Sequence, residues 1–210
     1  MAHGAVQPVE ATWDGGASPY GVSHQKLGMW LFILSDSMTF SALLIAYSYV
    51  RVASGTWPTP FKFFPSIVGA TVMTLVLLSS SLTMVVAVHA AHQGDAKKAV
   101  RYILATMACG LTFIILHVRE WLNLIEEGVR LWDNPWHVPL FGGTFFTLTG
   151  LHMAHVVSGV IYLGFIAAGL ARGKYTSDHV ENSGLYWHFV DLVWMFVFPL
   201  VYLMSVSRAG

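Results

Sequence analysis

The sequence predicts an all-α integral membrane protein, a bundle of five transmembrane helices. Its 210 residues are 55% hydrophobic and only 10% charged, with a mean hydropathy of +0.60. Soluble domains carry about 25% charged residues. Five apolar stretches are long enough for a helix that crosses the roughly 30 Å hydrocarbon core of a bilayer. They run near residues 27–50, 66–92, 99–124, 141–171 and 185–207.

The pattern within and between these stretches favours helices over a membrane barrel. Leu, Ile, Val, Met, Phe and Ala fill them without the strict alternation of barrel strands. The first four apolar stretches each end in a segment rich in turn residues. In chain order these segments are "GTWPTPFKFFP", "HQGDAKK", "DNPWHVP" and "ARGKYTSDH". Residues 27–207 are therefore predicted to form one transmembrane domain. The four tryptophans at positions 57, 132, 136 and 187 fall near predicted span ends, as in an interfacial aromatic belt.

The first residues, 1–26, are expected to form a loose N-terminal tail, because they hold few large apolar groups and no apolar signal-peptide core. The formal net charge is zero, which gives no indication of a nucleic-acid partner. Five spans would place six basic residues on the N-terminal side and five on the other, a nearly even split for the positive-inside rule. The compact "GDAKK" turn favours a cytoplasmic N-terminus and a C-terminus on the opposite side. No convincing internal repeat suggests an inverted-repeat transporter.

Asp36 is the first polar residue that needs an explanation. It follows Lys26 by about 15 Å of helix, which places it near the middle of the membrane. A lone acid there costs about 2.5–3.5 kcal/mol, so we expect it to be neutral, paired, or turned toward protein or water. Ser35 and Ser37 flank it as candidate hydrogen-bond donors. A structural role and a proton-handling or lipid-headgroup role both fit.

Three later spans each carry a polar pair spaced three residues apart, which puts both members on one helix face. We expect these faces to converge inside the bundle, because polar groups avoid lipid. The pairs are His117 with Glu120, His152 with His155, and His188 with Asp191.

Such pairs fit two kinds of chemistry. Di-iron bundles use carboxylates and histidines on facing helices, but their usual motif is Glu-x-x-His, which these pairs do not match. Haem would need histidines facing each other across helices, for which His89, His152 or His155 are the candidates. The interpretation we favour is an interhelical hydrogen-bond network, worth about 0.6 kcal/mol per bond. At the end of the fourth span, Arg172 and Lys174 are candidates for lipid phosphate or for simple snorkelling.

Four segments resemble subunit III of the haem-copper terminal oxidases, and the resemblance covers about residues 24–206. "YWHFVDLVWMFVFPLVYL" is similar to the last helix of that subunit and "GGTFFTLTGLHMAHVVSGVIYL" to the helix before it. "GMWLFILSDSMTFSALLIAY" resembles its first shared helix, with Asp36 at a buried acid, and "ILHVREWLNLIEEG" places Glu120 at another. The chain is similar to the five-helix bacterial form of the family.

The resemblance implies two helix groups forming a V-shaped, phospholipid-filled cleft, packed against subunit I in a bacterial inner membrane. It implies a non-catalytic chain without metal or haem, whose partner subunits carry haem and copper. Its expected partners are subunit I, subunit II and possible small subunits or a respiratory supercomplex. The implied role is support of proton uptake, lipid binding and stability of subunit I in an oxygen-reducing, proton-translocating complex. His188 and Asp191 would then be structural polar groups. Asp at position 36, where many members have Glu, resembles members of quinol oxidases and leaves the electron donor, cytochrome c or quinol, open.

Three other functions compete with this reading. One is a free-standing intramembrane metal or haem enzyme that uses the histidine pairs with Glu120 and Asp191. Another is a small proton-coupled channel or transporter that uses Asp36. The third is a subunit III-like component of nitric oxide reductase.

Overall fold

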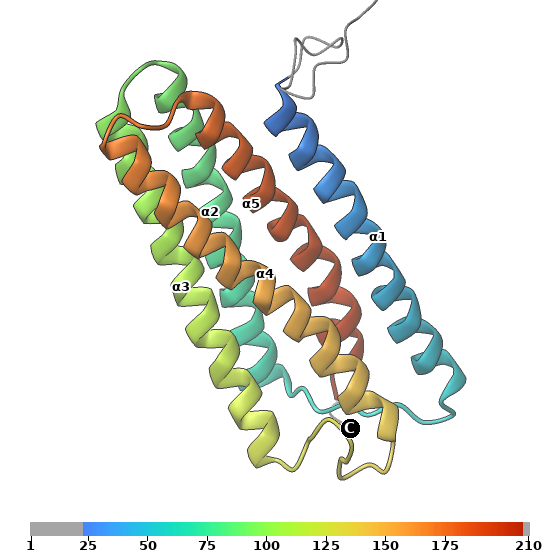
Figure 1. Ribbon diagram of the computed structural model, residues 1–210. Coiled ribbons are helices and arrows are strands. Elements are labelled where there is room, and N and C mark those ends of the chain that lie inside the picture. Colours follow the sequence, from blue (N-terminus) through green and yellow to red (C-terminus); the bar gives the residue numbers. More distant parts are fainter. Residues whose placement is uncertain (1–22, 208–210) are drawn as a thin grey trace, which may run out of the picture.

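The computed structural model describes residues 23–207, which contain five long α-helices lying side by side (Figure 1). Each helix, with its flanking turns, is long and apolar enough to cross a membrane, and the described part of the chain contains no strand. The prediction of an all-α, five-helix membrane protein is confirmed. The helices are α1 (His24–Ala53), α2 (Val68–His92), α3 (Ala96–Glu126), α4 (Pro139–Ala171) and α5 (Ser177–Val197).

Short helical turns of other types extend two of these helices. A π-helical turn, Phe63–Ile67, leads into α2, and the turns Phe198–Tyr202 and Leu203–Ser205 continue α5. Of the predicted tail, residues 1–22 lie outside the described part of the chain, whereas α1 already begins at His24.

The fifth helix begins at Ser177, well before the expected start near 185. Its first turns are polar in sequence, so an apolar stretch does not reveal them. Thr176 caps this end, with its backbone N–H donating to the His179 ring at 3.3 Å. Asn182 and Ser183 are nevertheless buried, because small and polar side chains let helices pack closely.

Tight turns bring consecutive helices back through the membrane. Gly94 follows α2 and Gly173 follows α4, both with positive φ (78° and 67°). Glycine takes this conformation without steric cost and so ends a helix abruptly. Both turns lie at the same end of the bundle as the start of α1 (Figure 1). The basic residues near them therefore share one side of the membrane.

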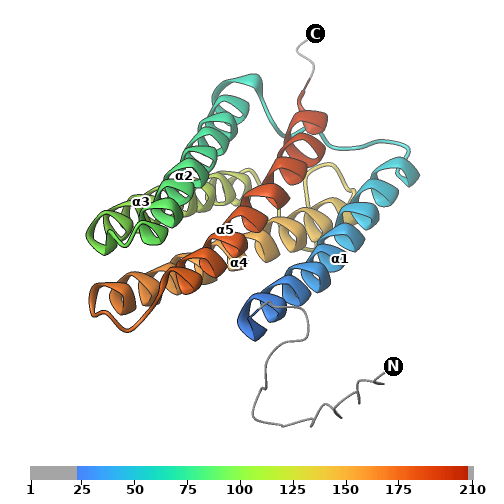
Figure 2. The same cartoon turned by 90° about the horizontal axis from the view of Figure 1, so that it is seen from above.

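The five helices are packed unequally. Neighbours α2 and α3 pack together, as do α3 and α4, α4 and α5, and α5 and α2, so these four close into a bundle. The remaining helix, α1, lies outside and packs on α4 and α5 (Figure 2). Only 6% of the most apolar 18-residue stretch of α1 is buried, against 50% for α4 and for α5. Helix α1 is thus the peripheral element, while the V shape and lipid filling of a cleft remain predictions.

Trp187 lies at the centre of the four-helix group. Its side chain is 1% exposed, and its indole N–H donates to Ser80 Oγ of α2 at 2.9 Å. A Cβ added to Gly110 of α3 would come within 2.6 Å of its ring, and one on Gly159 of α4 within 3.0 Å. The two glycines therefore make room for the indole. The expectation that Trp187 belongs to an interfacial belt is wrong.

Candidate functional site

Asp36 faces His155 across the interface between α1 and α4. The Oδ2 atom of Asp36 lies 2.8 Å from Nε2 of His155, and the two side chains are only 15% and 16% exposed. The other ring nitrogen, Nδ1, donates to the carbonyl oxygen of Leu151 at 2.8 Å. The Ser37 hydroxyl donates to the carbonyl of Ile33 instead of to Asp36. The intramembrane acid is therefore paired with an imidazole on a neighbouring helix.

The partners of His155 also constrain the protons of this pair. A carbonyl oxygen only accepts hydrogen bonds, so Nδ1 must carry a hydrogen. The other nitrogen, Nε2, is then the atom of His155 that faces the carboxyl group of Asp36. Pairing an acid with an imidazole lowers the cost of holding either group within the membrane.

His117 and His152 lie in a different place, inside the four-helix group. Both side chains are fully buried, and their rings lie 5.3 Å and 5.1 Å from the ring of Trp194. The ring of Phe113 lies 5.4 Å and 5.8 Å from the same two histidines. None of their four ring nitrogens has a hydrogen-bond partner among residues 23–207. Aromatic packing, and not a hydrogen-bond network, therefore surrounds these two imidazoles.

Glu120 lies one turn along α3 from His117, at the outer wall of the bundle. It is partly buried and lines a cavity of about 230 Å³ between α2 and α3. Arg119 and Asn123 line the same cavity, together with the apolar Met73. This acid is therefore open to a small cavity of mixed polar and apolar lining, unlike the enclosed histidines.

The third polar pair lies between α2 and α5. Nδ1 of His188 lies 2.6 Å from the hydroxyl of Ser81. Asp191, one turn further along, is 6% exposed, and neither of its carboxylate oxygens has a hydrogen-bond partner in the described part of the chain. This carboxyl group is therefore enclosed within the bundle, one turn along α5 from the His188–Ser81 contact.

The seven predicted intramembrane residues thus fall into separate places. The structure brings Asp36 to His155 and His117 to His152, but leaves Glu120 and the α5 pair apart from them. Among residues 23–207, no group of three or more His, Cys, Asp or Glu side chains is placed to hold a metal ion. Arg172 and Lys174 are both exposed in the turn after α4.

Residues not predicted as site residues supply many of the interhelical hydrogen bonds. They are hydroxyl and indole groups, whose weak polarity gave little signal within apolar sequence. Trp194 donates to Thr74, Thr83 bonds Thr106, and Ser158 bonds Tyr186, at 3.0, 2.8 and 2.7 Å.

Five apolar helices with acids and imidazoles at separate places between them define an integral membrane protein with a polar interior. Comparison with known protein families identifies the family to which this membrane protein belongs. The sequence profile described as cytochrome c oxidase subunit III matches residues 7–206, and the chain belongs to this family.

Individual relatives agree with this assignment. The chain is 34% identical over 186 residues to the quinol oxidase subunit 3 of Bacillus subtilis (strain 168), covering 86% of this chain and 87% of that protein. It is 31% identical over 183 residues to the cytochrome c oxidase subunit 3 of Bacillus sp. (strain PS3), covering 86% of each. It is 30% identical over 204 residues to the cytochrome c oxidase subunit 3 of Gadus morhua, covering 92% of this chain and 74% of that one. The resemblance to subunit III is confirmed.

Proposed function

We propose that this chain is an accessory subunit of an oxygen-reducing, proton-translocating haem-copper oxidase and has no catalytic centre of its own. The observation that carries the proposal is the family match, which extends over all five helices. Haem and copper belong to the partner subunits. The scattered positions of the potential ligands in residues 23–207 support this division of labour.

Within the complex, the chain packs against subunit I, with subunit II and possible small subunits or a supercomplex as further partners. It lies in a bacterial inner membrane, with the N-terminus in the cytoplasm and the C-terminus in the periplasm. The donor is either quinol or cytochrome c, since both occur in the names of relatives.

Asp36 and Glu120 are the proposed proton-related acids. The Asp36 carboxyl group lies 2.8 Å from His155 Nε2, so a proton that leaves this pair must be replaced from water or a neighbouring subunit for the pair to keep its net charge. Glu120 has a cavity beside it for a water molecule. Their role is to steady proton uptake by subunit I during turnover.

Bound phospholipid is the other proposed contribution. A hollow of about 310 Å³ lies where α1 meets α4 and α5, lined by Met29, Phe32, Ser158, Tyr162 and Tyr186. Its mostly apolar lining suits an acyl chain. Arg172 and Lys174, in the turn after α4, are candidates for a headgroup phosphate.

The first experiment is to measure haem, iron and copper in the purified chain and in the complex with which it co-purifies. An empty chain within a complex that holds haem and copper is the expected result. Stoichiometric iron or haem in the chain alone would contradict the proposal and support the intramembrane metal or haem enzyme.

The second experiment tests the proton-related role through Asp36→Asn in the assembled oxidase. Asparagine keeps the size of the side chain and its hydrogen bonding but removes the acid. We expect a normal initial rate of oxygen consumption followed by faster loss of activity during sustained turnover. Asp178→Asn, at an exposed position of α5, is the control and should decay as the native enzyme does. Equal decay of all three would contradict the role of Asp36.

A further inference from the structure

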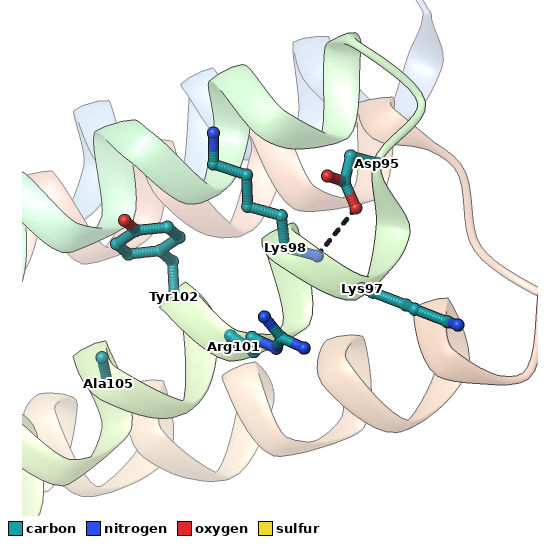
Figure 3. A pocket seen from close by; sticks show the side chains of 6 residues that line it. All are labelled: Asp95, Lys97, Lys98, Arg101, Tyr102 and Ala105. Carbon is teal, nitrogen blue, oxygen red and sulfur yellow. Dashed lines mark hydrogen bonds between the residues drawn. The ribbon is translucent and has the colours of Figure 1, made fainter.

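Helix α3 carries polar side chains at two levels that differ in their access to solvent. At its start, Lys97, Lys98 and Arg101 are exposed and line an open hollow of about 520 Å³ (Figure 3). About 24 Å further along the helix, His117 is fully buried and the indole nitrogen of Trp121 is enclosed. The polar groups of the second level therefore need hydrogen-bond partners inside the bundle.

His117 and Trp121 form one enclosed polar group with His152 of the neighbouring helix α4. The rings of His117 and Trp121 lie 5.3 Å apart. Both histidine rings contact Trp194 and Phe113, with ring centres between 5.1 and 5.8 Å apart. The three side chains therefore occupy one layer of the bundle, where α3 packs on α4.

The five nitrogen atoms of this enclosed polar group have no hydrogen-bond partner among residues 23–207. A neutral imidazole has one N–H and one bare nitrogen, and an indole has an N–H alone, so the group offers three donors and two acceptors. Elsewhere in the bundle, the buried indoles of Trp187 and Trp194 donate to hydroxyl groups of α2. Because an unpaired buried polar atom loses its hydrogen bond to water without replacement, the group requires a partner from outside the chain.

Water is the ligand that matches this set of donors and acceptors. A water molecule both donates and accepts, and a buried one typically makes about three hydrogen bonds. An anion would pair with the N–H groups but leave the bare nitrogens unsatisfied. A metal ion would need more ligands, because no three His, Cys, Asp or Glu side chains of residues 23–207 are grouped to hold one.

The cavity beside Glu120 can supply water to this layer. Leu116 and Glu120, which line the cavity, directly precede His117 and Trp121 in α3, so the cavity lies at the same level of the helix. Its volume of about 230 Å³ has room for several water molecules, at about 30 Å³ each.

We infer that His117, His152 and Trp121 bind a buried water molecule between α3 and α4, which exchanges with the surroundings through the cavity at Glu120. The water accepts hydrogen bonds from the indole and from one imidazole, and it donates to the bare nitrogen of the other imidazole. It thereby links two helices whose polar side chains in this layer do not bond each other. The inference rests on the packing of these helices and does not depend on the proposed role in the oxidase.

The test detects water at the ring nitrogens by solid-state nuclear magnetic resonance. The full chain, with isotope-labelled histidine, is placed in lipid bilayers, and magnetisation is transferred from water protons to the imidazole nitrogens. We expect transfer signals at His117 and His152 that disappear when the sample is exchanged into heavy water. His117→Phe and His152→Phe assign the two signals, and each should weaken the signal of the remaining histidine about threefold, the factor for one interhelical hydrogen bond.

A third variant serves if the histidine variants do not fold. Trp121→Phe keeps an aromatic ring and removes the indole N–H, so the water should exchange about threefold faster than in the native chain. Trp132→Phe, at an exposed loop position, and His188→Phe, whose ring bonds Ser81, are the matched controls. Both should leave the signals of His117 and His152 unchanged.

Three outcomes would overturn the inference. One is the absence of a water signal at His117 and His152 in the native chain, which would mean that their N–H groups point at aromatic faces instead. Another is a signal at one histidine that does not change when the other is replaced, because the water would then not be shared. The third is an equal exchange rate in Trp121→Phe and in the native chain. Because no measurement involves oxygen reduction, each of these outcomes leaves the proposed function standing.

Discussion

His152 and His155 stand one turn apart on the same helix and both have Phe40 of α1 nearby, yet their polar surroundings differ. His152 is fully buried among aromatic rings, and neither of its nitrogens has a partner in the described part of the chain. His155 contacts the acid of α1 with one nitrogen and a carbonyl of its own helix with the other. The first belongs to the core of the four-helix group, and the second fastens a peripheral helix to that group.

The difference shows what a three-residue spacing between two histidines predicts about their surroundings and what it does not. At 3.6 residues per turn, positions three apart point about 60° away from each other. That angle keeps both histidines out of lipid, but it is wide enough for them to meet different neighbours. A His-x-x-His motif therefore predicts burial without predicting a shared ligand.

The largest expected effect on stability is at the aromatic cluster around the buried His152. Trp194→Ala removes the ring that packs on both His117 and His152. Truncating a buried aromatic side chain costs about 3–5 kcal/mol. We expect a fall of this size in the free energy of unfolding, measured in mixed micelles. Leu192→Ala, on the exposed face of α5, should cost far less. A comparable loss for both would show that the aromatic cluster is not the stabilising core.

A smaller effect is expected on the side of His155. Asp36→Leu leaves Nε2 of a poorly exposed imidazole without its partner, which costs about 1–3 kcal/mol. Asp36→Asn keeps a polar partner and should recover most of this loss. The same unfolding assay measures both variants. If Asp36→Leu is as stable as the native chain, the contact in the structure does not hold α1 in place.

The sequence was sufficient to predict the helices but not their polar pairing. Five apolar runs separated by turn residues specify five spans, because the length of an apolar helix is set by the bilayer. By contrast, Asp36 and His155 are distant in the chain, and nothing in a single sequence states which helices are neighbours. Trp187 is predicted at the interface because the fifth apolar stretch begins near residue 185, whereas α5 begins at Ser177. The ring fits inside the bundle because Gly110 and Gly159 on two other helices make room for it.

The third prediction concerns a single interhelical hydrogen bond. Ser81→Ala removes the hydroxyl that bonds His188 between α2 and α5. Interhelical hydrogen bonds in membranes average about 0.6 kcal/mol, so we expect a loss near that value in the same assay. Ser79→Ala is the matched control, since the Ser79 hydroxyl donates to Leu75 of its own helix. Equal losses would mean that the bond to His188 adds nothing to stability.

Polar contacts along its whole length compensate for the shallow packing of α1. Lys26 near its start bonds Glu181 of α5 at 2.5 Å, and Asp36 in its middle contacts His155. At its end, Arg51 donates to the hydroxyl of Ser205 at 3.1 Å and to the carbonyl of Met204. A helix with few buried residues is thus held at three levels.

The smallest expected effect is at the contact between Lys26 and Glu181, because these side chains are 37% and 30% exposed. Exposed ion pairs are worth about 0.2–1 kcal/mol and are screened by salt. Glu181→Gln should lower the free energy of unfolding within that range at low ionic strength and by less at high ionic strength. Lys26→Gln should do the same, and the double variant should lose less than the sum, because the two residues share one interaction. His92, 3.6 Å from Glu181, would retain part of the attraction when Lys26 is removed. Additive losses that do not depend on salt would show that the Lys26–Glu181 pair contributes nothing to the attachment of α1.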